Sequence, residues 1–255
     1  MAPGKSKPAA ALLSPLLLGT LSGADAVRDY ARVEPTERGA DIVEVRLDLI
    51  PQGQWNAVFS ACDRLESSGT QVLSTIRLQA EGGSWTGGDE ARKAIFLRAL
   101  DHSSWVDVEA SSKLARFVCS EAHKRGRKAL VSSHDFSTTP SRAKLEKLYS
   151  KSLGLGADIV KVATMPTKNE HHVALVGLVS DHASEKKLCA IGMGAFGLPL
   201  RIYLPTIGSM FAYAYIDKHS APGQLSCSHM LDMLRLQIPR FNEKYLARTK
   251  SLEAA

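Results

Sequence analysis

The feature that most constrains the fold is a regular succession of apolar segments, each of which ends in a polar residue. Successive ends fall 25 to 32 residues apart, at Thr20, Arg46, Arg77, Glu109, His134, Lys161 and Met193. Each interval has room for one strand and one helix, which is the length of a βα unit. Because an eighth apolar run follows at residues 208–215, we expect a single (β/α)8 barrel domain over residues 1–255, with flexible tails at residues 1–9 and 248–255.

The residues before these ends alternate as strands do. Residues 41–49 alternate, with Glu44, Arg46 and Asp48 on one face and Val43, Val45, Leu47 and Leu49 on the other. Acids and a base on the inward face of a strand indicate a polar cavity there. Further strands are expected in residues 71–77, 104–109, 127–136, 156–166 and 186–194, and helices in residues 89–102, 141–153 and 229–236.

Lys161 is the first functional candidate, because it stands inside an apolar run. Its neighbours Ile159, Val160, Val162 and Ala163 fit a parallel strand that is covered on both faces. A charged amine in such a place is costly unless it is paired or neutral. Burial favours the neutral amine, which is a nucleophile toward ketones. The alternative is a lysine that pairs with a buried carboxylate or extends its amine to the strand end.

The overall charge narrows the classes of partner only slightly. A net charge of +6 is compatible with anionic ligands. The basic residues are scattered along helix-like segments, however, without the basic and aromatic motifs that bind nucleic acid. No segment is long enough to span a bilayer. We therefore expect neither a nucleic-acid partner nor a membrane.

The cysteines and histidines, which could form disulfides or bind a metal, are dispersed along the chain. The four cysteines, which contain no C-x-x-C pair, are Cys62, Cys119, Cys189 and Cys227. Their spacing favours reduced thiols in a cytoplasmic protein. The histidines His171, His172 and His182 fall in an expected amphipathic helix. We interpret them as solvated helix residues and expect no metal.

The first residues could be a targeting signal or a strand. Lys5 and Lys7 precede the apolar run of residues 9–18, and residues 24–26 resemble a small-residue cleavage site. Ser14 interrupts that run, which favours a first strand after a short tail.

Three glycines, Gly192, Gly194 and Gly197, match the dinucleotide-binding pattern G-x-G-x-x-G after an expected strand. Asp217, twenty residues after Gly197, even matches the acidic residue that such a site uses to bind the ribose. A dinucleotide-binding domain needs several further βα units after this turn, and only 58 residues remain. We therefore expect no NAD and no other cofactor.

Taken together, these segments resemble the type I 3-dehydroquinate dehydratase family of the shikimate pathway. The matching stretches include Glu44-Val45-Arg46-Leu47-Asp48, Thr75-Ile76-Arg77, Glu81-Gly82-Gly83, Asp107-Val108-Glu109, Ser133-His134-Asp135-Phe136, Lys161 with Pro166, Met193 with Arg201, Gly208-Ser209 and Ser220-Ala221-Pro222-Gly223-Gln224. They run in order from the second expected strand to the loop after the last one.

The resemblance implies a Schiff-base lyase that acts without a cofactor or metal. Lys161 would form an imine with the C3 ketone of 3-dehydroquinate, and His134 would remove the C2 proton and return one to the departing C1 hydroxyl. Arg201 would hold the carboxylate, and Glu81 would support His134 and Lys161. The remaining substrate contacts implied are Glu44, Arg46, Arg77, Ser220, Gln224 and, on the first strand, Ser14.

The resemblance has two departures and implies further properties. Leu200 stands where the family more often has a serine, and Ile191 stands where a methionine is common in bacterial members. Both changes concern packing around the pocket. Family members are commonly dimers, so a homodimer is expected.

Other functions account for part of the pattern. A different Schiff-base barrel, such as a class I aldolase, would also use Lys161 but leaves Arg201 and the loop of residues 220–224 without a purpose. A noncatalytic barrel that binds quinate-like acids would need neither His134 nor Lys161.

Overall fold

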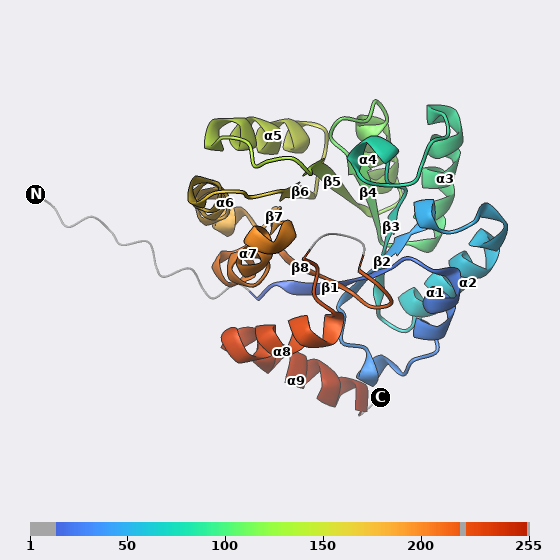
Figure 1. Ribbon diagram of the computed structural model, residues 1–255. Coiled ribbons are helices and arrows are strands. Elements are labelled where there is room, and N and C mark those ends of the chain that lie inside the picture. Colours follow the sequence, from blue (N-terminus) through green and yellow to red (C-terminus); the bar gives the residue numbers. More distant parts are fainter. Residues whose placement is uncertain (1–13, 220–222, 254–255) are drawn as a thin grey trace, which may run out of the picture.

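The expected barrel is confirmed by the computed structural model, which describes residues 14–219 and 223–253. Eight parallel strands form one sheet in the order β7-β6-β5-β4-β3-β2-β1-β8 and occupy the centre of the molecule (Figure 1). They are β1 (Leu16–Leu21), β2 (Ile42–Arg46), β3 (Gln71–Thr75), β4 (Trp105–Glu109), β5 (Lys128–Asp135), β6 (Ile159–Thr164), β7 (Leu188–Gly192) and β8 (Phe211–Tyr215).

The ends of the sheet approach each other and nearly close the barrel. At the start of β8, the Met210 amide donates a hydrogen bond to the Leu188 carbonyl of β7 over 2.8 Å. The Ser209 hydroxyl also accepts a hydrogen bond from the Ala190 amide over 3.1 Å. These contacts bring the last two strands together around a central site.

Helices surround the strands, as Figure 1 shows. In the described residues they are α1 (Ala24–Tyr30), α2 (Trp55–Ser67), α3 (Asp89–His102), α4 (Ala115–Lys124), α5 (Arg142–Gly154), α6 (Asn169–His182), α7 (Gly194–Ile207), α8 (Cys227–Gln237) and α9 (Pro239–Glu253). Short 3-10 turns occur at Pro35–Glu37, Leu47–Leu49, Gln52–Gln54, Gln79–Glu81 and Ala183–Glu185. None of the helices in residues 14–219 and 223–253 combines the length and apolar character needed to cross a bilayer.

The inner face of the barrel changes from apolar to polar along β2. On β2, Val43 and Val45 pack outward in the core shared with the helices, whereas Ile42 belongs to a second apolar cluster inside the barrel. Glu44 and Arg46 follow Ile42 on that inner face and line a cavity. Because side chains alternate along a strand, the same sequence pattern builds both an apolar floor and a polar mouth.

The amino-terminal apolar run is a strand of the barrel. Its residues Leu18 and Thr20 pair in parallel register with β2 and β8. Residues 1–13, which include the whole expected tail of residues 1–9, lie outside the described residues.

The carboxyl-terminal end differs from the expectation of a tail from Arg248. Instead, α9 continues to Glu253. The Arg248 guanidinium donates to Asp41 Oδ1 over 2.5 Å and lies 5.5 Å from the centre of the Tyr245 ring. Contacts with a residue more than two hundred positions earlier hold this segment, and no local pattern reveals them.

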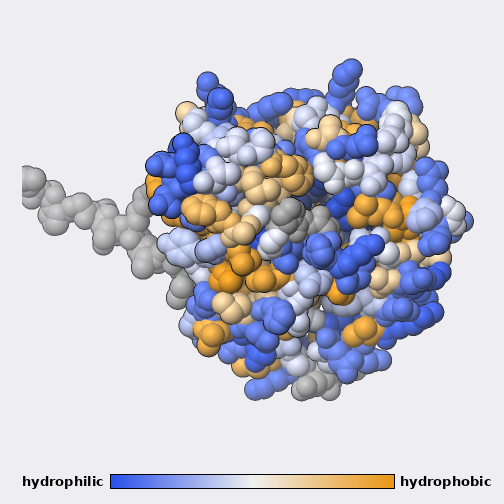
Figure 2. Space-filling view, viewed as in Figure 1, coloured by the Kyte–Doolittle hydropathy of each residue, from blue (hydrophilic) through white to orange (hydrophobic). Residues whose placement is uncertain are grey.

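The face shown in Figure 2 is mainly hydrophilic at its rim, while hydrophobic side chains gather on the side of α6 and α7. Exposed apolar residues of these helices include Val173, Phe196 and Tyr203. The buried apolar side chains of these helices pack against the outer faces of the strands, so an apolar core surrounds the barrel.

Candidate active site

The polar strand ends converge on one cavity. It is lined by Thr20, Glu44, Arg46, Arg77, Glu81, Gly82, His134, Phe136, Lys161, Ala163, Ile191, Met193, Arg201, Tyr213 and Gln224. Every strand of the barrel except β4 contributes a lining residue or precedes one directly. The cavity thus lies at the carboxyl ends of the strands, where barrels of this kind carry their chemistry.

Lys161 lies at the middle of β6 with its side chain directed into the barrel. The residue is 6% exposed, and its Nζ is 3.6 Å from Asp107 Oδ2. The same nitrogen lies 4.1 Å from the centre of the Tyr213 ring. The amine therefore has one acidic neighbour and one aromatic neighbour, and both are buried.

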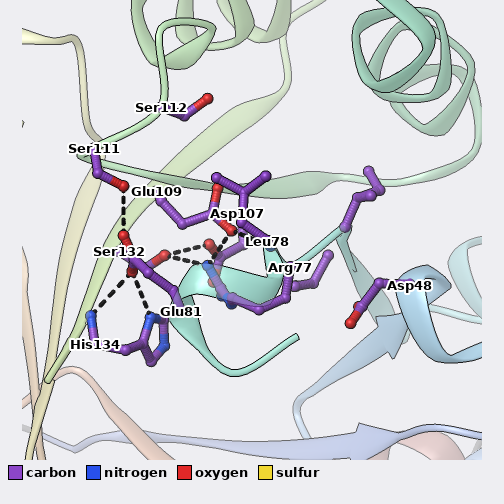
Figure 3. Close-up of polar contacts among 12 residues, drawn as sticks. Asp48, Arg77, Leu78, Glu81, Asp107, Glu109, Ser111, Ser112, Ser132 and His134 are labelled. Atoms are coloured by element: carbon purple, nitrogen blue, oxygen red, sulfur yellow. Dashed lines mark hydrogen bonds and ion pairs between the residues drawn. The ribbon is translucent and has the colours of Figure 1, made fainter. Parts of the chain in front are cut away.

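Asp107, the acidic neighbour of Lys161, belongs to a network of buried charges around Arg77, and Figure 3 shows this network. Arg77 donates to Asp107 Oδ2 over 2.6 Å, to Glu109 Oε1 over 3.0 Å and to Ser132 Oγ over 2.7 Å. Burial acts to raise the pKa of Asp107, but the Arg77 and Lys161 cations hold it below its usual value. Asp107 is therefore an anion at neutral pH, and both Lys161 and Arg77 contact it.

A second guanidinium completes this network from outside the barrel. Arg92, on α3, is fully buried; it contacts Glu109 Oε2 and donates to the Ile76 carbonyl through Nε over 3.0 Å. Glu109 thereby contacts two guanidiniums. The negative charges of Asp107 and Glu109, both on β4, balance the positive charges of Arg77 and Arg92. This arrangement fixes Arg77 within the wall of the cavity.

His134 is oriented by Glu81. Glu81 Oε2 lies 3.0 Å from His134 Nδ1 and also accepts the His134 amide over 3.1 Å (Figure 3). The other carboxylate oxygen, Oε1, accepts a hydrogen bond from the Ser111 hydroxyl over 2.5 Å. With Nδ1 engaged, Nε2 is the ring nitrogen available to a ligand.

The charge state of this pair follows from burial. Burial lowers the pKa of His134 well below 6.5, and the Arg77, Lys161 and Arg46 cations lower it further. Burial also raises the pKa of Glu81 above its ordinary value. His134 is therefore a neutral imidazole at pH 7 and can accept a proton.

The residues of β2 are held in place before any ligand arrives. Asp48 receives two hydrogen bonds from Arg46, of 2.9 Å from Nε and 2.8 Å from Nη2, and its Oδ2 also accepts the Ser84 amide over 3.0 Å. Glu44 accepts hydrogen bonds from the hydroxyls of Thr20 over 2.9 Å and Thr75 over 2.8 Å. The two hydrogen bonds from Arg46 to Asp48 restrict the guanidinium and present it to the cavity in one orientation.

Arg201 comes from α7 rather than from a strand. It is 4% exposed, and burial lowers its pKa to about 10. The guanidinium therefore remains charged at neutral pH although it is buried. Gln224 lines the same cavity from the loop after β8.

The predicted site residues fall into three groups. Eight of them line the cavity, namely Glu44, Arg46, Arg77, Glu81, His134, Lys161, Arg201 and Gln224. Ser220 lies outside the described residues. Ser14 is not among the residues that line the cavity.

Ser14 lies before β1, in a hollow with Asp41 and Arg248 at the amino end of the barrel. A strand advances about 3.3 Å per residue, so a residue that precedes β1 cannot reach the mouth. Thr20, near the other end of the strand, lines the cavity instead.

Sequence reasoning assigned no role to three inward-facing residues of the site, Thr20, Asp107 and Tyr213. Asp107 alternates with Val106 and Val108, and Tyr213 alternates with Ala212 and Ala214, a pattern that could have placed both on the inner face. Leu200 is buried in the outer core, and Ile191 lines the cavity.

The chemistry available is that of an amine and an imidazole in a cationic cavity. A buried amine can add to a ketone, a neutral imidazole can remove a proton, and guanidiniums can hold a carboxylate or hydroxyl groups. Within the described residues, no cluster of three or more histidine, cysteine or acidic side chains has the arrangement of a metal site.

Comparison with known proteins identifies similar molecules. The family model for type I 3-dehydroquinase matches residues 20–238. The 3-dehydroquinate dehydratase of Methanothrix thermoacetophila is 34% identical over 227 residues, which cover 87% of this chain and 92% of the relative. The crystal structure of the 3-dehydroquinate dehydratase from Aquifex aeolicus is 26% identical, with a TM-score of 0.75 over 87% of this chain and 98% of that one.

Proposed function

The chain belongs to the type I 3-dehydroquinase family, and we propose that it dehydrates 3-dehydroquinate to 3-dehydroshikimate through an imine on Lys161. The observation that carries this proposal is a buried lysine and a neutral histidine lining one cavity together with the guanidiniums of Arg77 and Arg201. The relatives that match most of this chain bear the name 3-dehydroquinate dehydratase. The enzyme is accordingly a hydro-lyase.

The proposed reaction begins at Lys161. Lys161 gives up one proton, and its free amine adds to the C3 ketone. The resulting carbinolamine takes up one proton and loses water, so that Nζ becomes the nitrogen of an iminium. This cation withdraws electrons from the neighbouring carbon and acidifies its C–H bond. His134 then takes the C2 proton, the electron pair forms the C1–C2 double bond, and the C1 hydroxyl leaves as water with the proton from His134. Hydrolysis of the imine releases the product and restores the amine.

The remaining lining residues hold the substrate. Arg201 would bind the carboxylate, because a guanidinium matches it with two parallel hydrogen bonds. Arg46, Glu44, Arg77, Gln224 and Ser220 would bind the ring hydroxyls and carboxylate. Glu81 would keep the His134 ring in one orientation and one tautomer.

Trapping the imine tests the proposal. We compare the wild type with Lys161→Ala and with the control Lys144→Ala, which changes an exposed residue of α5. Each protein is incubated with 3-dehydroquinate and borohydride, and its mass is measured by intact-protein mass spectrometry. We expect a reduced adduct on the wild type and the control and none on Lys161→Ala. An adduct on Lys161→Ala, or turnover by the wild type without any adduct, would refute the assignment.

We further propose that the enzyme works in the cytoplasm as a homodimer. Free thiols support the first part, since Cys62, Cys119 and Cys189 are buried and unbridged and Cys227 is also unbridged. The resemblance to a commonly dimeric family supports the second. Light scattering coupled to gel filtration would give the mass in solution, and a monomer at micromolar concentration would contradict the dimer.

A further inference from the structure

The hydroxyl of Tyr213 is an unusual feature of the cavity floor. Tyr213 is 6% exposed, and its Oη is buried without a hydrogen-bond partner among the described residues. A buried hydroxyl without a partner costs free energy in the ligand-free protein, so a native structure that keeps one invites an explanation. Its place among the cavity-lining residues indicates that the partner arrives with the ligand.

The ring position limits which ligand atom this hydroxyl can meet. Lys161 Nζ lies 4.1 Å from the centre of the Tyr213 ring, and Oη is one ring radius and one C–O bond away from that centre. A carbon bonded to Nζ therefore stands beside the phenol, and the substituents of that carbon's neighbours come within reach of Oη. The inference rests on the proposed function, in which this carbon is C3 of 3-dehydroquinate.

We propose that Tyr213 Oη donates a hydrogen bond to the C4 hydroxyl of the substrate. Of the two ring carbons next to C3, C2 is a methylene that surrenders its proton, and C4 is the one that carries an oxygen. The hydrogen bond would satisfy the unpartnered phenol and fix the orientation of the substrate ring relative to the Lys161 side chain, which presents C2 to His134.

The environment of the phenol makes it a hydrogen-bond donor rather than an acid. Burial raises its pKa well above 10, and the Glu44, Cys189 and Asp107 groups raise it further. The ring contributes separately, because a cation at Nζ is attracted to the ring face whether the group is an ammonium or an iminium. Phenylalanine at this position would keep the ring contact and lose only the hydrogen bond.

Kinetics with two substrates test the proposal. We compare the wild type with Tyr213→Phe and with the control Tyr203→Phe, which changes a tyrosine of α7 that is 49% exposed. Each protein is assayed with 3-dehydroquinate and with its 4-deoxy analogue. A neutral hydrogen bond is worth about 3- to 10-fold in binding. We expect Tyr213→Phe to raise KM by that factor for 3-dehydroquinate, with kcat changed less than about twofold, and to leave KM for the analogue unchanged. Equal losses for both substrates, or no loss for either, would overturn the proposal.

Thermal unfolding without ligand gives a readout that does not depend on turnover. Removing a buried hydroxyl without a partner should raise the Tm of Tyr213→Phe by about 2–4 °C, because the folded protein no longer buries an unsatisfied polar group. A lower Tm would mean that the hydroxyl has a structural role, and it would overturn the proposal. If the wild type itself gives neither turnover nor a borohydride adduct, the proposed function fails, whereas loss of the substrate-specific KM effect alone refutes only the role of Tyr213.

Discussion

Replacing Glu109 by glutamine tests the buried charge network beside the cavity. The Glu109 side chain is fully buried; Oε1 accepts hydrogen bonds from Arg77 and from the Leu78 amide, each over 3.0 Å, and Oε2 contacts Arg92. Arg92 is also fully buried, and Glu109 is its only acidic partner within residues 14–219 and 223–253. The substitution removes one charge, keeps the shape of the side chain and leaves Arg92 with neutral acceptors alone.

The size of the effect follows from the number of partners lost. Removal of one member of a buried ion pair costs about 3–5 kcal/mol, because the other charge stays buried. Arg77 retains Asp107 at 2.6 Å, and glutamine still offers one accepting oxygen, so we expect the lower end, about 3 kcal/mol. This loss would lower the Tm by about 6–12 °C in a domain of this size. A stability of about 5–15 kcal/mol, as is usual for folded domains, would leave the variant folded.

Urea unfolding followed by circular dichroism measures the loss. The matched control is Glu90→Gln, which removes a charge from an exposed pair with Lys93 at 3.7 Å and should change the stability little. The double variant Arg92→Met with Glu109→Gln removes both buried charges and should recover part of the loss. A cost for Glu109→Gln below about 1 kcal/mol, or equal to that of Glu90→Gln, would refute the view that this network is held by charge.

The remaining predictions concern His134, the proposed general base, and Arg201, the proposed carboxylate anchor. His134→Ala should lower kcat by at least about 10²-fold, the usual contribution of a general base, in an absorbance assay of the conjugated product; an unchanged kcat would exclude that role. Arg201→Ala should mainly raise KM, because it removes a guanidinium that binds ground state and transition state alike, and a fall in kcat alone would contradict this. The pKa of His134 is held well below 6.5, chiefly by burial, so the unfolded chain binds its proton first. The stability that this residue contributes is complete above about pH 6.5 and declines as the pH falls below it. Urea unfolding at about pH 7.5 and pH 5.5 should therefore show a smaller decline for His134→Gln than for the wild type, and equal declines would contradict this reasoning.

The barrel could be predicted because its signal is local. Alternation with a period of two along β2 separated Glu44 and Arg46 from Val43 and Val45, and the structure places these pairs on opposite faces. The helix expected in residues 89–102 coincides with α3. Short-range periodicity of this kind reflects the geometry of a single element and needs no knowledge of its neighbours.

The ends of the chain were harder, since their conformation depends on distant partners. Ser14 was assigned to the mouth because a short apolar strand can be aligned in more than one register. The segment after Arg248 reads as a polar tail, and its helix is held by Asp41, which lies 207 residues earlier.

The sequence by itself determined the repeating βα units, the inward face of most strands and the presence of Lys161 in an apolar strand, because each is encoded within a few consecutive residues. Tertiary structure alone decided the geometry of the site. Glu81 meets His134 across 53 residues, and Arg77 meets Ser132 across 55. Burial of these groups together sets their pKa values and left the Tyr213 hydroxyl without a partner. Contacts and desolvation of this kind arise only when strands that are distant in the chain close into one barrel.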